Sequence, residues 1–188
     1  MALALFAPLQ KSAAGVQDGA AALERGEYAK AFEIWQPLAE EGDPLAQYNL
    51  AQLLRTGHGV SRDFVLAAYW YRQAAEQGFA RAQYNLGLMN LNGDGLAKDP
   101  SMAAHWFLKS AENRHVDAQI QLGLLHLKGF HPEADVGRGA MWIEIAAYNG
   151  SATALKLLEE VLESMTPAQA ERSTDLVRQC ISRQFRDC

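Results

Sequence analysis

The side chains best suited to chemistry lie near residue 130. His126 and His131 are five residues apart, and Glu133 and Asp135 follow them. Imidazoles and carboxylates are common zinc ligands, but they must converge on one point at about 2 Å. We expect His126 on a helix that stops at Gly129, where such convergence would be accidental. Since the sequence also lacks Cys-x-x-Cys, His-Glu-x-x-His and calcium-loop spacings, we expect no metal and no other cofactor.

Nucleophilic chemistry has no better support in the sequence. No Gly-x-Ser-x-Gly occurs, and three of the serines lie near expected helix starts, where capping accounts for them. Glutamates recur once every 36 residues, at Glu40, Glu76 and Glu112. That recurrence favours an architectural role over a catalytic carboxylate pair. We therefore expect that the protein is not an enzyme and has no catalytic residues.

The 36-residue step organises most of the chain. It links Leu50, Leu86, Leu122 and Leu158, and Trp70 with Trp106 and Trp142; Arg114 stands where the other units have Gly42, Gly78 and Gly150. A fixed period of 20–50 residues is typical of a solenoid. The 32 alanines fit this interpretation, because small residues let neighbouring helices approach closely.

Each unit has the pattern of a helix hairpin. Ala82, Leu86 and Met89 are spaced as on one face of a helix, and the glycines at 93 and 95 end that helix. Asp99-Pro100 then begins a second helix, with Asp as an N-cap or the residue before it and Pro in the first turn. A single hairpin cannot bury its apolar face, so neighbouring hairpins must stack.

Three motifs together resemble the Sel1-like repeat, a relative of the tetratricopeptide repeat with a longer turn. They are Trp-Tyr-Arg-Gln-Ala-Ala-Glu-Gln-Gly at 70–78, Ala-Gln-Tyr-Asn-Leu-Gly at 82–87 and Gly-Asp-Gly-Leu-Ala-Lys-Asp at 93–99. The resemblance covers roughly residues 45–150. It implies an all-α, right-handed α/α solenoid of about five helix hairpins with a C-terminal capping helix.

This fold gives an expected domain organisation. We expect one solenoid over 16–188, with repeats near 16–41, 44–77, 80–113 and 116–149 and a cap over 152–188. Residues 1–15 are apolar and then small, which is typical of a truncated signal peptide, although a disordered N-terminus is the alternative. The turn at 129–135 should be the most irregular, because His131 replaces its second glycine.

The two cysteines, Cys180 and Cys188, lie in the last nine residues. A pair this close suits an oxidising compartment, and two free thiols are the alternative. Eight residues of continuous helix would separate the Cα atoms by about 12 Å, which is too far for a disulfide. If the bridge forms, the last helix must end between the cysteines and the tail must fold back and bury Phe185. Secreted bacterial Sel1-like proteins often end in Thr-Pro followed by paired cysteines. This resemblance supports the bridge and a periplasmic or secreted location. The alternative is a cytoplasmic protein, if residues 1–14 are not a signal remnant.

Charge and hydropathy exclude several classes of partner. The formal net charge is −5 and the sequence has no basic run, so we expect no nucleic-acid partner. No apolar run approaches the ~20 residues of a membrane span. The expected partner is a protein or peptide, and self-association is a further alternative because a stacked solenoid has two ends.

In the tetratricopeptide relatives, the first helix of each hairpin lines a concave groove, and the resemblance implies that a partner binds there. The expected groove residues are Leu45, Tyr48, Gln52, Arg55, Arg81, Tyr84, Leu88, Asn92, Asp117, Ile120 and Lys128. Tyr48, Tyr84 and Ile120 could instead pack between successive hairpins. We therefore expect a non-enzymatic interaction or scaffold module. The alternative is an envelope enzyme or binder acting on β-lactam or cell-wall compounds, as described for some Sel1-like proteins that carry a disulfide in each repeat.

Overall fold

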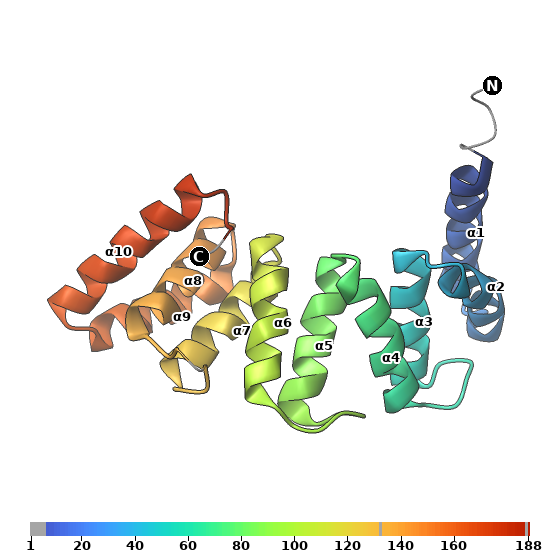
Figure 1. Ribbon diagram of the computed structural model, residues 1–188, viewed down its shortest axis with the longest axis horizontal. Coiled ribbons are helices and arrows are strands. Elements are labelled where there is room, and N and C mark those ends of the chain that lie inside the picture. Colours follow the sequence, from blue (N-terminus) through green and yellow to red (C-terminus); the bar gives the residue numbers. More distant parts are fainter. Residues whose placement is uncertain (1–6, 132, 187) are drawn as a thin grey trace. The chain divides into compact units, whose positions relative to one another are not determined.

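The computed structural model describes residues 7–131, 133–186 and 188 (Figure 1). Within these residues it contains ten α-helices and no strand, which confirms the all-α solenoid prediction. The helices are α1 (Ala7–Glu24), α2 (Tyr28–Glu40), α3 (Pro44–Thr56), α4 (Phe64–Glu76), α5 (Ala80–Asn92), α6 (Pro100–Glu112), α7 (Val116–Leu127), α8 (Val136–Tyr148), α9 (Ala152–Ser164) and α10 (Pro167–Ser182).

The chain divides into two compact units. The first holds α1–α4, the start of α5 up to Ala82, and residues 93–97; the second holds residues 83–92 and residues 98–188. Helix α1 includes residues 7–15 of the segment expected to be a signal remnant or disordered, and residues 1–6 lie outside the described part of the chain.

Aspartates at matching repeat positions begin the second helices. Asp99 is the N-cap of α6, and its Oδ1 accepts hydrogen bonds from the backbone N–H groups of Ser101 and Met102 at 2.9 and 3.0 Å. Asp63 and Asp135 cap α4 and α8, and each accepts one backbone N–H, from Leu66 and Arg138 respectively. These bonds satisfy donors that the first helical turn leaves unpaired. The predicted Asp99-Pro100 helix start is therefore confirmed.

Glycines within the turns permit a close approach to the start of the second helix of the preceding hairpin. In the first unit, a Cβ atom at Gly59 would collide with the backbone of Tyr28 and Ala29, and one at Gly95 would collide with the backbone of Phe64. Both glycines also have a positive φ, which few other residues adopt cheaply. One further step of 36 residues along the chain, the position that follows Gly59 and Gly95 is occupied by His131.

Small residues face large ones in both cores. Trp35 of α2 is buried against Gly19 of α1, and its Nε1 donates a hydrogen bond to the Val16 carbonyl at 3.1 Å. In the second unit a Cβ at Gly87 would lie 2.6 Å from the buried Phe107 ring. These contacts explain why close helix packing needs glycine at these positions.

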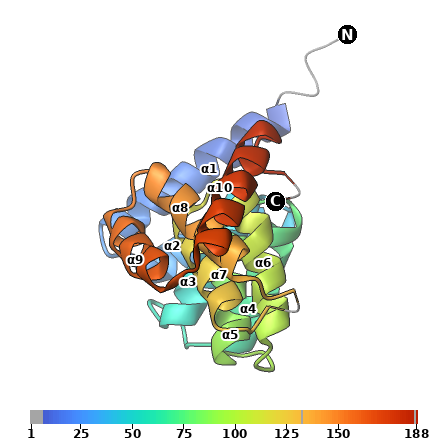
Figure 2. The same ribbon diagram turned by 90° about the vertical axis from the view of Figure 1, so that its left-hand side faces the viewer.

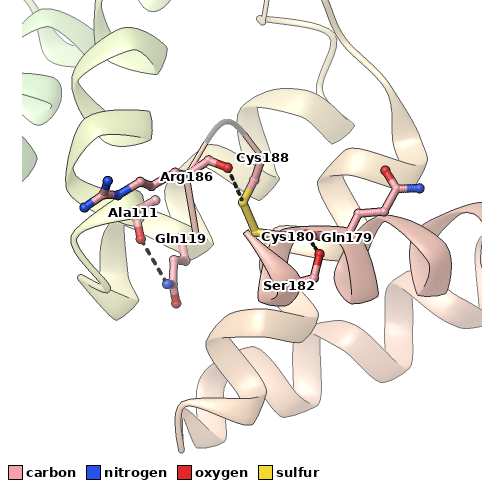
Figure 3. The surroundings of a disulfide bond; sticks show 7 residues. All are labelled: Ala111, Gln119, Gln179, Cys180, Ser182, Arg186 and Cys188. Carbon is pink, nitrogen blue, oxygen red and sulfur yellow. Dashed lines mark hydrogen bonds between the residues drawn. A yellow bond between two sulfur atoms is a disulfide. The ribbon is translucent and has the colours of Figure 1, made fainter. Parts of the chain in front are cut away.

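The C-terminal tail folds back onto the second unit (Figure 3). Helix α10 ends at Ser182, and the Cys180–Cys188 disulfide joins Cα atoms 5.0 Å apart. Phe185 is only 7% exposed and packs in the same apolar cluster as Cys180, Phe107 and Trp142. The structure confirms the disulfide, the end of the helix between the cysteines and the burial of Phe185.

Candidate functional site

In the first unit, three of the expected groove residues form one hydrogen-bonded group on α3. The Gln52 amide donates to Tyr48 Oη at 2.9 Å, while its carbonyl oxygen accepts from Arg55 Nε and Nη2 at 3.2 and 3.1 Å. The same oxygen accepts from Tyr71 Oη on α4 at 2.5 Å. The Gln52 side chain is therefore fixed from both sides, and it holds the half-buried Arg55 guanidinium in place.

Tyr48 also packs between neighbouring aromatic rings. Its centroid lies 5.8 Å from that of Tyr71 and 5.1 Å from that of Phe79. Leu45, one turn earlier on α3, is 40% exposed. Tyr48 therefore packs against neighbouring rings while it remains partly exposed, and its role in partner binding stays a prediction.

In the second unit, Tyr84 has a similar double character. Its ring stacks on His115 at 4.7 Å and lies 5.8 Å from Phe107. Burial raises the pKa of the Tyr84 phenol, and the nearby Asp117 carboxylate raises it further. Asp117 is itself exposed, so the tyrosine presents a neutral hydroxyl beside a solvated negative charge.

The remaining expected residues differ in exposure. Ile120 is only 8% exposed and packs in the core that α7, α8 and α9 share, and Leu88 is half-buried against the other core cluster. Asn92 and Lys128 lie exposed near the ends of their helices, and Arg81 is exposed on the part of α5 that belongs to the first unit.

A hollow of about 500 Å³ opens between α7 and α9, and we call it the α7–α9 hollow. Ile120, Leu124 and Leu157 supply most of its apolar lining, and Lys156 and Glu160 bring opposite charges to it. Lys156 and Glu160 are not among the expected groove residues, although the sequence contains a signal for them. One further step of 36 residues carries Ile120 to Lys156 and Leu124 to Glu160.

The histidines near residue 130 form a stacked pair. The His126 and His131 rings lie 4.0 Å apart at an angle of 20°. Burial, helped by the charges of His131 and Arg138, lowers the pKa of His126 to about 4, so its ring is neutral at pH 7. Within the part of the chain that the structure describes, no three His, Cys, Asp or Glu side chains form a group suited to a metal ion.

Buried glutamines form a periodic feature outside the expected groove residues. Gln119 Nε2 donates to the Ala111 carbonyl at 3.2 Å, and its Oε1 accepts from Asn149 Nδ2 at 3.1 Å. Gln47 makes the matching pair of bonds with Ala39 and Gln77 in the first unit. The 36-residue recurrence of glutamine at 47, 83 and 119 was the available signal.

The comparisons with known proteins agree with this architecture. A solved Sel1 repeat protein from Oxalobacter formigenes is 29% identical, covers 79% of this chain and superposes with a TM-score of 0.72. A second solved structure is c5321, a protective antigen of uropathogenic Escherichia coli strains with an SLR fold; it is 26% identical, covers 93% of this chain and has a TM-score of 0.63. The chain spans 62% and 47% of the length of these two proteins.

No curated protein sequence matches the chain. Across the described residues, no helix combines the length and apolar character that a membrane span requires. The Sel1 repeat model matches three consecutive segments, 44–79, 80–115 and 116–151, which together make up more than half of the sequence. The chain therefore belongs to the Sel1 repeat family.

Proposed function

We propose that the protein is a non-enzymatic interaction module that binds a protein or peptide on the surface formed by the first helices of its hairpins. Sel1 repeats commonly act as protein-interaction modules. The α7–α9 hollow is the observation that carries the proposal for this chain. It is an open apolar depression with Lys156 and Glu160 beside it, at positions that continue the expected groove series.

The hydrogen-bonded group of Tyr48, Gln52 and Arg55 in the first unit supports the same proposal. Two hydrogen bonds to Gln52 hold the guanidinium before any partner arrives, so little side-chain entropy is lost on binding. Arginine and tyrosine supply much of the binding energy at protein interfaces. In the second unit, a partner segment with an apolar anchor and an acidic group fits Lys156 and the apolar floor near Ile120. In the first unit, an acidic group of a partner fits Arg55.

The compartment is a second part of the proposal. The Cys180–Cys188 disulfide suggests an oxidising environment. We therefore place the protein in the periplasm or among secreted proteins of a bacterial envelope. Reductant-free mass analysis of the protein isolated from its native cells tests this, and two alkylatable thiols would contradict it.

Charge reversal on the first helices tests the binding surface. Arg55→Glu and Lys156→Glu should each reduce capture of the native partner at least about fivefold, because each brings like charge to the acidic partner. Arg72→Glu is the matched control, since Arg72 is an exposed arginine on the second helix α4. Circular dichroism should show unchanged helicity in all three. Equal capture of the partner by the three variants would show that the partner does not bind the proposed surface.

A further inference from the structure

A second hollow, separate from the first, lies over α8. Both α9 and α10 pack against α8, and the three helices lie side by side (Figures 1 and 2). Between them is a depression of about 300 Å³, which we call the α8–α10 hollow. Leu155 and Leu158 of α9 line one side, and Val177 and Ile181 of α10 line the other. The buried Phe185 ring of the disulfide-anchored tail also lines it.

Large apolar side chains at this hollow face water. Tyr148 is 81% exposed, Leu155 is 53% exposed and Ile181 is 45% exposed. A single exposed apolar residue on a surface is ordinary, but a group of them around a concave depression is typical of an interaction site. The volume is near the lower end of the range of ligand-binding pockets, and it would hold one or two apolar side chains.

The polar groups around the hollow indicate the charge of the occupant. Glu144 of α8 is its one acidic lining residue and is only partly exposed, and burial raises the pKa of its carboxyl group. Among the described residues, no ion pair includes Glu144. Helix α9 adds the exposed Glu159 and Glu163. A cationic group placed beside the hollow would neutralise a carboxylate that no basic side chain of the described chain pairs with.

We propose that the α8–α10 hollow is a second docking site, and that its occupant is a segment of a protein partner with an apolar side chain flanked by lysine or arginine. The apolar side chain enters between Leu155 and Ile181, and the basic group pairs with Glu144. A second copy of this chain fits less well, because it would bring α9 glutamates against α9 glutamates. The site has an apolar centre beside a carboxylate, as in grooves that accept basic amphipathic helices.

This inference does not depend on the proposed function, because the two hollows use different faces of α9. Lys156, Leu157 and Glu160 line the α7–α9 hollow, whereas Leu155 and Leu158 line the α8–α10 hollow. Arg55→Glu should therefore leave binding at the α8–α10 hollow unchanged. An experiment can therefore contradict the proposal for one hollow and leave the proposal for the other intact.

The probe is a synthetic peptide of about fourteen residues, with leucines at helical spacing on one face and lysines on the other. Its binding to the full chain is measured by calorimetry. Leu155→Ser and Glu144→Gln should each raise the dissociation constant at least about fivefold. Leu66→Ser and Glu76→Gln are matched controls, because Leu66 is a similarly exposed leucine and Glu76 an exposed glutamate, both on α4; each should change the constant less than about twofold.

A second measurement does not rely on variants. Backbone amide resonances of the unmodified protein should shift on peptide addition around Glu144, Leu155 and Ile181 and remain in place on α3. The proposal is overturned by absence of binding up to about 1 mM peptide, by equal binding of a peptide with glutamate in place of lysine, or by equal loss in the control variants. A dimer that dissociates on the Leu155→Ser change would also overturn it, since the occupant would then be a second copy.

Discussion

The guanidinium of Arg114 lies 4.8 Å from the centroid of the Phe185 ring, in a cation–π arrangement. Arg114 also has a positive φ of 61°, at the repeat position where the other units have glycine. For a residue with a Cβ, this backbone conformation is unfavourable by about 1–2 kcal/mol. The ring contact stabilises the folded state by about 0.5–1 kcal/mol at an exposed site. The exception to the glycine pattern thus coincides with the place where the C-terminal tail returns.

Replacing Arg114 separates the two effects. Arg114→Ala keeps the strained backbone and loses the ring contact, so the free energy of unfolding should fall by about 0.5–1 kcal/mol. Arg114→Gly loses the same contact but removes the strain, so it should be close to the unmodified protein and more stable than Arg114→Ala. Urea denaturation measures both. An alanine variant as stable as the glycine variant would contradict this account.

Opening the disulfide should free the tail. The bridge closes a loop with a sequence separation of 8 residues, and its loss should lower the free energy of unfolding by about 2–3 kcal/mol. Phe185 should then leave its cluster with Cys180 and Trp142. The measurement is urea denaturation with and without dithiothreitol.

Cys188→Ser is the control for the disulfide. It should match the reduced protein and show no response to reductant. A wild-type unfolding midpoint that does not move on reduction would mean that packing, rather than the bridge, holds the tail.

The sequence predicted the repeated part of the molecule well because its packing is local. The Asp99 cap and the 36-residue period both depend on residues within one repeat or its neighbour. The contact between Arg114 and Phe185 joins a residue of a repeat to a residue of the non-repeating tail, so the 36-residue period could not predict it. Likewise, the repeat register alone did not show that Ile120 would be almost fully buried.

Loss of a buried glutamine should be costly. Gln119→Leu preserves most of the side-chain volume but removes the hydrogen bonds that Gln119 makes with the Ala111 carbonyl and the Asn149 amide. Each intramolecular hydrogen bond contributes about 0.5–1.5 kcal/mol, so the loss of these two should lower the free energy of unfolding by about 1–3 kcal/mol. Gln121→Leu, two residues further along α7 and partly exposed, should change it by less than about 0.5 kcal/mol. Similar losses in both variants would show that the leucine itself, and not the missing hydrogen bonds, is responsible.

Acid should destabilise the fold through His126. Burial lowers its pKa to about 4 in the folded protein, while an unfolded chain keeps the ordinary value near 6.5, so the unfolded state binds the proton first as the pH falls. Stability from this group is complete above pH 6.5 and is lost between about pH 6.5 and 4, by about 1–3 kcal/mol. Burial also lowers the pKa values of His105 and His131, which act in the same direction. His126→Asn should therefore reduce the slope in urea denaturation at several pH values without removing it, and the fold should tolerate this change because the preceding repeat has Asn90 at the same position. His58→Asn, at an exposed histidine of the first unit, should retain the full slope. If the His126→Asn protein keeps the wild-type slope, the acid sensitivity arises from other groups.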